Sequence, residues 1–134
     1  MSTKAKGTHA ERELFHMLWD QGFAVLRCAG SGSTTKPAVD LIAGNGTHFL
    51  AIECKALKGK AKYLSQEDIE QLLTFAQQYG AEAWIAVRFD NKGWRFIEAQ
   101  KIEKSKGNRF VVSYEWLQKQ GVGFEDLIRG YLMA

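Results

Sequence analysis

The chain has 134 residues, a formal net charge of +3 and 46 % hydrophobic residues. A chain of this length fits one domain with one core, so we expect a single domain over residues 1–134. The hydrophobic content argues against wholesale disorder. No apolar run is long enough to span a bilayer, and the N-terminus lacks the apolar core of a signal peptide. We therefore expect an intracellular, cytoplasmic protein without a membrane partner.

The first predicted element is a helix that begins at Thr8. Thr8 and Glu11 have the spacing of a capping box, in which hydroxyl and carboxylate bond the first free backbone N–H groups. Apolar residues follow at helical spacing until Gly22, a typical C-terminal stop. A strand is predicted over residues 23–28, and a Gly/Ser/Thr-rich loop over residues 29–37 leads onward.

Residues 39–55 are predicted to form a β-hairpin, because two apolar runs are joined by Asn45 and Gly46. An Asn-Gly pair between such runs is the strongest short-range hairpin signal. A two-residue turn at this pair aligns Gly44 with Thr47. The register of the whole hairpin follows from that turn.

This register places three ionisable side chains on one face of the hairpin. Asp40 stands opposite Ala51, and Glu53 is its diagonal neighbour, roughly 7–8 Å away. Lys55 takes the next position on the same face. Burying two acids and a lysine on an apolar hairpin is costly unless they do chemistry, and two carboxylates at this spacing suit a shared metal ion.

After the hairpin the sequence predicts a basic connection over residues 55–62 and a second helix. Ser65 is the expected N-cap of this helix, which ends near Gly80 and suits a crossover between parallel strands. The remaining predicted elements are strands at residues 82–89, 94–98 and 109–114 and a helix at residues 124–132. This order predicts an α/β fold with a mixed central β-sheet flanked by helices.

Charge is unevenly distributed along the chain. Residues 1–62 contain 9 Lys or Arg and 5 Asp or Glu, whereas residues 63–134 contain 9 and 10. A basic half around acidic residues suits a metal-dependent site that acts on a polyanion. Lys58, Lys60 and Lys62 lie where a nucleic-acid backbone would pass the hairpin. The two Cys and three His lack metal-ligand spacing, and no nucleotide-binding fingerprint is present.

Each acidic residue also has a structural interpretation. Asp40 could be a turn residue, and Glu53 with Lys55 an exposed ion pair worth only about 0–1 kcal/mol. Their apolar flanks and their place at the end of a central strand favour function. Glu11 stays open: it is either a capping residue or, with Phe15 and Leu18 at helical spacing, a carboxylate directed toward the sheet.

These residues carry a family resemblance. Asp40 followed by Glu53-Cys54-Lys55 resembles the PD-(D/E)XK nuclease signature, with Val39 in place of the proline. Glu11 stands where that superfamily often has a helical carboxylate, and Gln71 resembles its downstream glutamine. The resemblance implies a restriction-endonuclease-like fold.

Three motifs in a chain of this length resemble the archaeal Holliday junction resolvases more narrowly: Glu11-Arg12-Glu13, Gly30-Ser31-Gly32 and Glu53-Cys54-Lys55. The resemblance implies a Mg²⁺-dependent, structure-selective endodeoxyribonuclease. Such an enzyme resolves four-way DNA junctions by paired symmetric nicks in recombination and repair, and it would be nucleoid-associated.

The resemblance also implies a role for each residue. Glu11, Asp40, Glu53 and the Cys54 carbonyl would hold one or two Mg²⁺ ions. Lys55 would position the attacking water or offset charge on the phosphate, and Ser31 would act beside it. Gln71 would support the site. The expected DNA-binding residues are Arg12, Ser31, Lys36, Lys58, Lys60 and Lys62.

A homodimer is expected, because one site per chain cannot cut two opposed strands symmetrically. The apolar residues Leu127, Ile128, Tyr131, Leu132 and Met133 are a candidate interface. A sliding clamp is a further candidate partner, although the chain contains no clean clamp-binding motif. The alternatives are another PD-(D/E)XK nuclease of nicking, repair, restriction or RNA-cleaving type, or a non-catalytic structure-specific DNA-binding protein.

Overall fold

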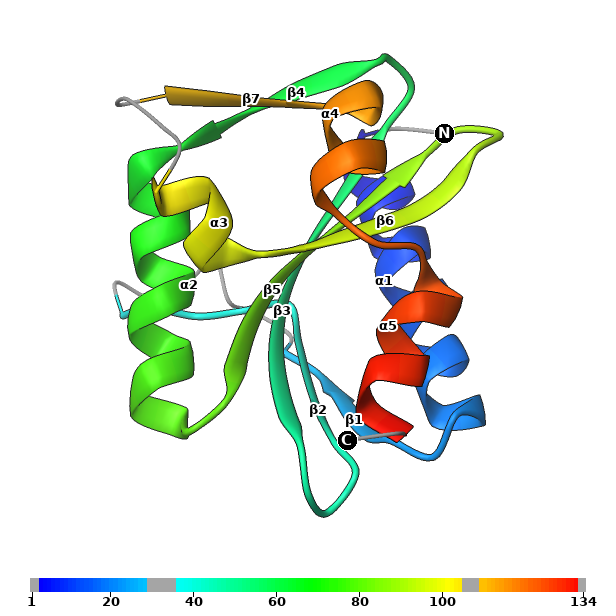
Figure 1. Ribbon diagram of the computed structural model, residues 1–134, viewed down its shortest axis with the longest axis vertical. Helices are drawn as coiled ribbons and strands as arrows, with labels where there is room; N and C mark the ends of the chain where they lie inside the picture. Colours follow the sequence, from blue (N-terminus) through cyan, green and yellow to red (C-terminus); the bar gives the residue numbers. More distant parts are fainter. Residues whose placement is uncertain (1–2, 29–35, 105–108, 133–134) are drawn as a thin grey trace.

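A computed structural model describes residues 3–28, 36–104 and 109–132 (Figure 1). The strands are β1 (Ala24–Arg27), β2 (Leu41–Gly44), β3 (Phe49–Leu57), β4 (Ala61–Ser65), β5 (Glu82–Phe89), β6 (Gly93–Glu98) and β7 (Arg109–Ser113). The helices are α1 (Thr3–Asp20), α2 (Gln66–Tyr79), α3 (Ala99–Lys104), α4 (Tyr114–Gln120) and α5 (Phe124–Leu132). Among these helices none is long and apolar enough to cross a membrane.

Five strands form one mixed sheet in the order β1-β2-β3-β5-β6. All neighbours are antiparallel except β3 and β5, which are parallel and joined through α2. The prediction of a parallel crossover through the second helix is therefore confirmed, as is a central position for β3. Strands β4 and β7 pair separately as an antiparallel ribbon.

Helices cover both faces of the sheet. In Figure 1, α2 lies on one side of β3 and β5, and α1 and α5 lie on the other. Each face has its own core: Leu72 of α2 packs with Ile85 and Val87, and Leu14 of α1 packs with Ile52 and Ala86. Alternating residues of β3 and β5 thus supply both cores, and the predicted α/β class is confirmed.

The loop of the β2–β3 hairpin is longer than predicted. Gly44 pairs with Phe49 instead of Thr47. The side chain of Asn45 accepts hydrogen bonds from the backbone N–H groups of Thr47 (2.9 Å) and His48 (2.7 Å), so these groups are not available for the ladder. The register moves by two residues, which leaves every side chain on its predicted face.

Helix α1 begins earlier than predicted. It starts at Thr3, so Thr8 lies inside the helix and the predicted capping box is wrong. An ion pair of 2.6 Å between Lys6 and Asp90, at the end of β5, ties this early part of the helix to the sheet. Glu11 lies in the interior of the helix, so it does not act as a capping residue. The predicted stop is confirmed, since the helix ends at Asp20 before Gly22, whose φ is +90°.

Helix α5 does not present the predicted dimer surface. Leu127 and Ile128 are only 3 % and 5 % exposed, because they belong to the core that residues of α1 and of the sheet form together. Tyr131 accepts a hydrogen bond of 2.7 Å from Trp84. The side chain of Leu132 and all of Met133 lie outside the described part of the chain. Leu127 and Ile128 of the predicted interface thus belong to the interior, and Tyr131 is half-buried.

Three elements were missed by sequence reasoning. Strand β4 replaces part of the predicted basic connection, and helices α3 and α4 follow β6 and β7. The predicted strand at residues 109–114 ends at Ser113, which is the N-cap of α4 and accepts a 3.0 Å hydrogen bond from the backbone of Trp116. The ribbon depends on pairing between distant segments, which local sequence patterns do not reveal.

Candidate active site

The side chains of Asp40 and Glu53 lie close enough to interact. The β2–β3 register ends where Leu41 pairs with Ile52, and Asp40 comes directly before β2. The backbone N–H of Asp40 donates to the carbonyl of the same Ile52 at 3.1 Å, so the ladder is not continued regularly at Asp40. The carboxyl groups of Asp40 and Glu53 are joined by a hydrogen bond, so the structure brings the two acids together.

Asp40 is held in place from both neighbouring strands. Its carbonyl accepts a hydrogen bond of 2.8 Å from the backbone of Cys28, just after β1. Its Oδ2 accepts another of 2.8 Å from the backbone N–H of Cys54 in β3. The carboxylate orientation is therefore fixed before any ligand arrives, which is what a preorganised site requires.

Glu53 and Lys55 complete a compact group with Asp40. Lys55 Nζ lies 3.5 Å from Glu53 Oε2, and the two side chains are only 20 % and 25 % exposed. Burial, together with the charge of Asp40, raises the pKa of Glu53 to about 7, although Lys55 opposes the shift. The protein alone therefore does not satisfy the negative charge of both carboxylates.

Glu11 approaches this pair from helix α1. Burial and the charge of Asp40 raise its pKa, and Arg27 at the end of β1 lies 3.4 Å from its Oε1. No group of three or more His, Cys, Asp or Glu in the described part of the chain is arranged to hold a metal ion. Glu11 thus stands beside the Asp40–Glu53 pair, and its predicted role as a direct ligand stays a prediction.

Arg27 is a candidate that sequence reasoning missed. Its Nε is buried and finds no hydrogen-bond partner among the described residues. The signal was present, since alternation along β1 puts Arg27 on the same face as buried Val25, toward α1. A cation there can orient Glu11 or meet an anionic ligand.

The other predicted residues are spread more widely. Ser31 and its motif lie outside the described residues. Arg12, Lys36, Lys58 and Lys60 are exposed, and Lys62 is half-buried in β4.

Gln71 is not brought to the carboxylate pair. It is exposed on α2, and its amide donates a hydrogen bond of 3.3 Å to Glu67 of the same helix. The structure therefore gives it a local partner on the surface of α2.

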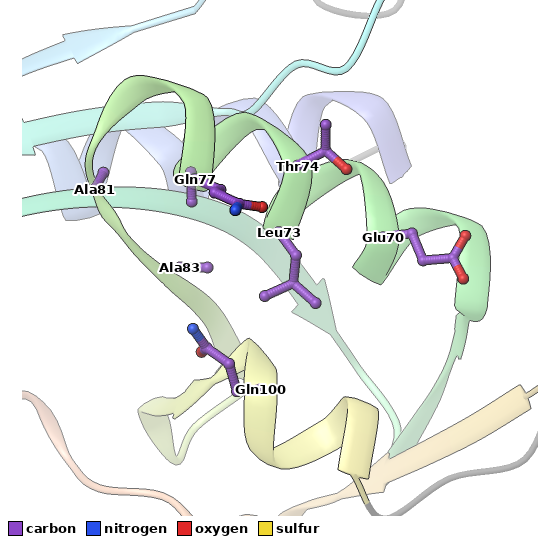
Figure 2. Close-up of a pocket in the computed structure, with 8 residues that line it drawn as sticks. Glu70, Leu73, Thr74, Gln77, Ala81, Ala83 and Gln100 are labelled. Carbon is purple, nitrogen blue, oxygen red and sulfur yellow. The ribbon is translucent and has the colours of Figure 1, made fainter.

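The hollow between α2 and α3 offers little chemistry. It has a volume of about 470 Å³, and Figure 2 shows Leu73 pointing into it between Gln77 and Gln100. Glu70 is the one ionisable side chain among the described residues that line it. Acid–base or metal chemistry is therefore better supported at Asp40 and Glu53.

The arrangement at β2 and β3 suits a hard divalent cation. Paired carboxylate oxygens are the ligands such cations prefer, and a bound cation would neutralise the charge that burial disfavours. Lys55 adds a positive group beside the pair. These donors fit a metal-assisted reaction on an anionic substrate.

Comparison with known proteins identifies the family of the chain. The family model described as archaeal Holliday junction resolvase (Hjc) matches residues 2–133. The crossover junction endodeoxyribonuclease Hjc of Archaeoglobus fulgidus is 48 % identical over 105 residues, covering 78 % of this chain and 77 % of that protein. The Hjc of Methanocaldococcus jannaschii is 40 % identical over 123 residues, covering 92 % and 86 %.

Solved structures agree with this assignment. The structure of Archaeoglobus fulgidus Hjc, described as a Holliday junction resolvase, superposes with a TM-score of 0.82 at 39 % identity, covering 92 % of this chain and 98 % of that chain. The bacterial homing endonuclease I-Ssp6803I has a TM-score of 0.61 at 12 % identity, covering 98 % and 96 %, which is a likeness of fold alone. The restriction-endonuclease-like fold is confirmed, and the chain belongs to the archaeal Holliday junction resolvase family.

Proposed function

We propose that this member of the family is a structure-selective endodeoxyribonuclease that resolves four-way DNA junctions, with residues 1–134 as one nuclease domain. The observation that carries the proposal is the close pairing of the Asp40 and Glu53 carboxyl groups, with Lys55 at 3.5 Å from Glu53. The name crossover junction endodeoxyribonuclease, shared by its relatives, supports the substrate class.

The cation in this proposal is Mg²⁺, one or two ions per site. Asp40, Glu53 and the carbonyl of Cys54 would hold it, and Glu11 would act from α1 as a ligand or through a bound water. When bound, the metal supplies Lewis-acid activation of the scissile phosphate and of the attacking water. The buried, like-charged carboxylates support this assignment, because they lack a neutralising partner of sufficient charge.

The remaining residues of the proposal bind and orient DNA. Lys55 offsets the charge that develops on the phosphate, from a fixed position beside Glu53. Arg27 pairs with Glu11 at 3.4 Å, and its buried Nε, which has no hydrogen-bond partner among the described residues, could donate to a ligand. The contacts to the DNA backbone are assigned to the exposed residues Arg12, Lys36, Lys58 and Lys60, to half-buried Lys62 of β4, and to Ser31, which lies outside the described residues. Such contacts position the junction without reading its bases.

We also propose a homodimer, with an interface different from the one predicted on α5. Four large apolar side chains around a hollow of about 500 Å³ are strongly exposed: Leu26 (69 %), Tyr79 (53 %), Trp19 (49 %) and Phe49 (44 %). A contiguous exposed apolar surface marks an interaction site. A second copy of the chain is the natural occupant, since symmetric cutting of two strands requires two sites related by a two-fold axis.

This apolar surface shares a face of the sheet with the catalytic pair. Leu26 pairs with Ile42, Ile42 pairs with Ala51, and Ala51 points to the same side of β3 as Glu53. Association through this face would therefore set two Asp40–Glu53 pairs on either side of the two-fold axis. We expect Leu26→Glu to shift the protein from dimer to monomer in sedimentation equilibrium, whereas Leu26→Met leaves the dimer intact. A monomeric wild type would overturn the dimer proposal.

A substrate panel tests the activity itself. An immobile four-way junction, its matched linear duplex and an RNA duplex are incubated with wild type and Mg²⁺, and products from each strand are mapped. We expect paired nicks in opposite strands of the junction only. Equal cutting of linear duplex or RNA would favour another nuclease of the superfamily. Junction binding without any cutting would favour a structure-specific DNA-binding protein.

A further inference from the structure

A further cavity opens on the opposite face of β3 from the catalytic carboxylates. Its volume is about 330 Å³. Ala56 of β3 lines it and directly follows Lys55, so its side chain points to the other side of the strand. The other lining residues come from α1 and from the ends of β3 and β5: Lys6, His9, Ala10, Lys58, Arg88 and Asp90.

Cations outnumber carboxylates in this cavity. Lys6, Lys58 and Arg88 face a single lining carboxylate, Asp90. Lys6 Nζ lies 2.6 Å from one oxygen of Asp90, and a terminal nitrogen of Arg88 lies 4.0 Å from the other. Asp90 offsets the charge of Lys6, and Glu13 of α1 offsets that of Arg88 through an ion pair of 2.9 Å, so Lys58 supplies the excess positive charge.

Arg88 is oriented before any ligand binds. Its Nε donates a hydrogen bond of 2.9 Å to Glu13 Oε1 of α1, and the same oxygen accepts a 2.6 Å hydrogen bond from the Trp94 indole. This bond uses one edge of the guanidinium and leaves its terminal N–H groups directed elsewhere. A planar fork fixed in this way matches the oxygens of a phosphate group.

We infer that this cavity binds a phosphate of the DNA backbone, held by Lys6, Lys58 and Arg88. The inference rests on the proposed function and extends its DNA contact to the second face of the sheet. Lys55 and Ala56 are neighbours on β3, so the cavity and the catalytic pair lie at the same end of one strand. A backbone that crosses this end of β3 can therefore meet both.

A purely structural role for the cluster makes a different prediction. If Lys6 and Asp90 only tie α1 to β5, then Lys6→Ala and Asp90→Asn break the same ion pair, and both changes affect junction binding in the same direction. If the cavity binds phosphate, Lys6→Ala removes a donor, whereas Asp90→Asn removes a repelling charge. The two variants should then shift junction affinity in opposite directions.

The test is junction binding by the full chain, measured by fluorescence anisotropy without Mg²⁺ over a series of salt concentrations. We expect Lys6→Ala and Lys58→Ala each to weaken binding by roughly tenfold and to lower the slope of log affinity against log salt by about 0.9. Asp90→Asn should tighten binding severalfold. Lys119→Ala, which removes an exposed charge on α4 outside the cavity, is the matched control.

Each outcome is informative. Thermal unfolding separates folding defects from binding, since Lys6→Ala and Asp90→Asn break the same ion pair. Wild-type affinity and salt slope in Lys58→Ala would overturn the inference, as would weaker binding by Asp90→Asn. Failure of the wild type to bind the junction would instead contradict the proposed function.

Discussion

Glu53 and Glu13 lie on opposite faces of the sheet, and their carboxyl pKa values are shifted in opposite directions. Glu53 is buried beside Asp40, and its pKa rises to about 7. Glu13 is also partly buried, which by itself raises its pKa, but hydrogen bonds from Arg88 and Trp94 outweigh burial and lower it. At Glu53 the ion pair with Lys55 is outweighed by burial and by the charge of Asp40, whereas at Glu13 the partners outweigh burial.

This contrast separates function from structure. A carboxylate whose charge the protein satisfies stabilises the fold, as Glu13 does by fixing Arg88 and Trp94. A carboxylate whose charge is not satisfied lowers the stability of the fold. Residues of this kind are concentrated at active sites. Replacing each carboxylate by its neutral amide tests whether Glu53 and Glu13 differ in this way.

The largest effect is expected on cleavage. Asp40→Asn and Glu53→Gln each remove one charged ligand from the pair, and we expect losses on the order of 10³-fold or more in single-turnover rate. The exposed Glu98 at the end of β6 provides the matched control, Glu98→Gln, which should cut at the wild-type rate. Rates are measured at saturating protein on an immobile junction. Cleavage by Glu53→Gln within tenfold of wild type would contradict the account.

Glu53→Gln, which is expected to abolish cleavage, should at the same time stabilise the metal-free protein. The folded pKa of about 7 exceeds the ordinary value of 4.5. The stabilising contribution of this group is thus fully present below pH 4.5 and is lost as pH rises through 7. With chelator at pH 8, Glu53→Gln should raise the free energy of unfolding by up to about 3 kcal/mol. In urea titrations the gain in unfolding free energy should be small at pH 5. An equal gain at pH 5 and pH 8 would contradict a raised pKa of Glu53 as its cause.

Glu13→Gln should act in reverse. Because its folded pKa is lowered, the contribution of Glu13 to stability is present above pH 4.5 and is lost as pH falls below that value. We expect the variant to lose about 1–2 kcal/mol of unfolding free energy at pH 7, since Arg88 and Trp94 keep only a weaker acceptor. The loss of unfolding free energy should be smaller at acid pH. A Glu13→Gln variant more stable than wild type at pH 7 would contradict the difference between Glu13 and Glu53.

A smaller effect on cleavage is expected at Glu11, which lies beside the Asp40–Glu53 pair instead of within it. If it acts through a bound water or by orienting charge, Glu11→Gln should slow cleavage by about tenfold to a hundredfold. Raising the Mg²⁺ concentration should restore part of the rate. A loss as large as that of Glu53→Gln would instead make Glu11 a direct ligand.

Local signals predicted much of this molecule from its sequence. Strand β5 spans residues 82–89 as expected, and Ser65 and Gly80 bound α2 as its N-cap and C-cap. Caps and strand alternation depend on neighbouring residues, so they are visible in the sequence. The hairpin register was wrong by two residues, yet Asp40 and Glu53 stayed on one face because side chains alternate.

Long-range contacts decided what sequence reasoning missed. The start of α1 is tied by Lys6 to Asp90, 84 residues away. The pairing of β4 with β7 and the contact of Arg27 with Glu11 likewise join distant segments. The prediction that Leu127 and Ile128 contribute to an interface was wrong for a related reason, since an apolar stripe at helical spacing can pack in an internal core as well as against a partner.

Anomalous diffraction from crystals soaked in Mn²⁺ would test the central claim most directly. Mn²⁺ takes the same oxygen ligands as Mg²⁺ and can be located by its own scattering. We predict a peak between the carboxylates of Asp40 and Glu53 that disappears in Glu53→Gln. A peak bound elsewhere, or none at this pair in protein that still cuts junctions, would contradict the assignment of the catalytic centre.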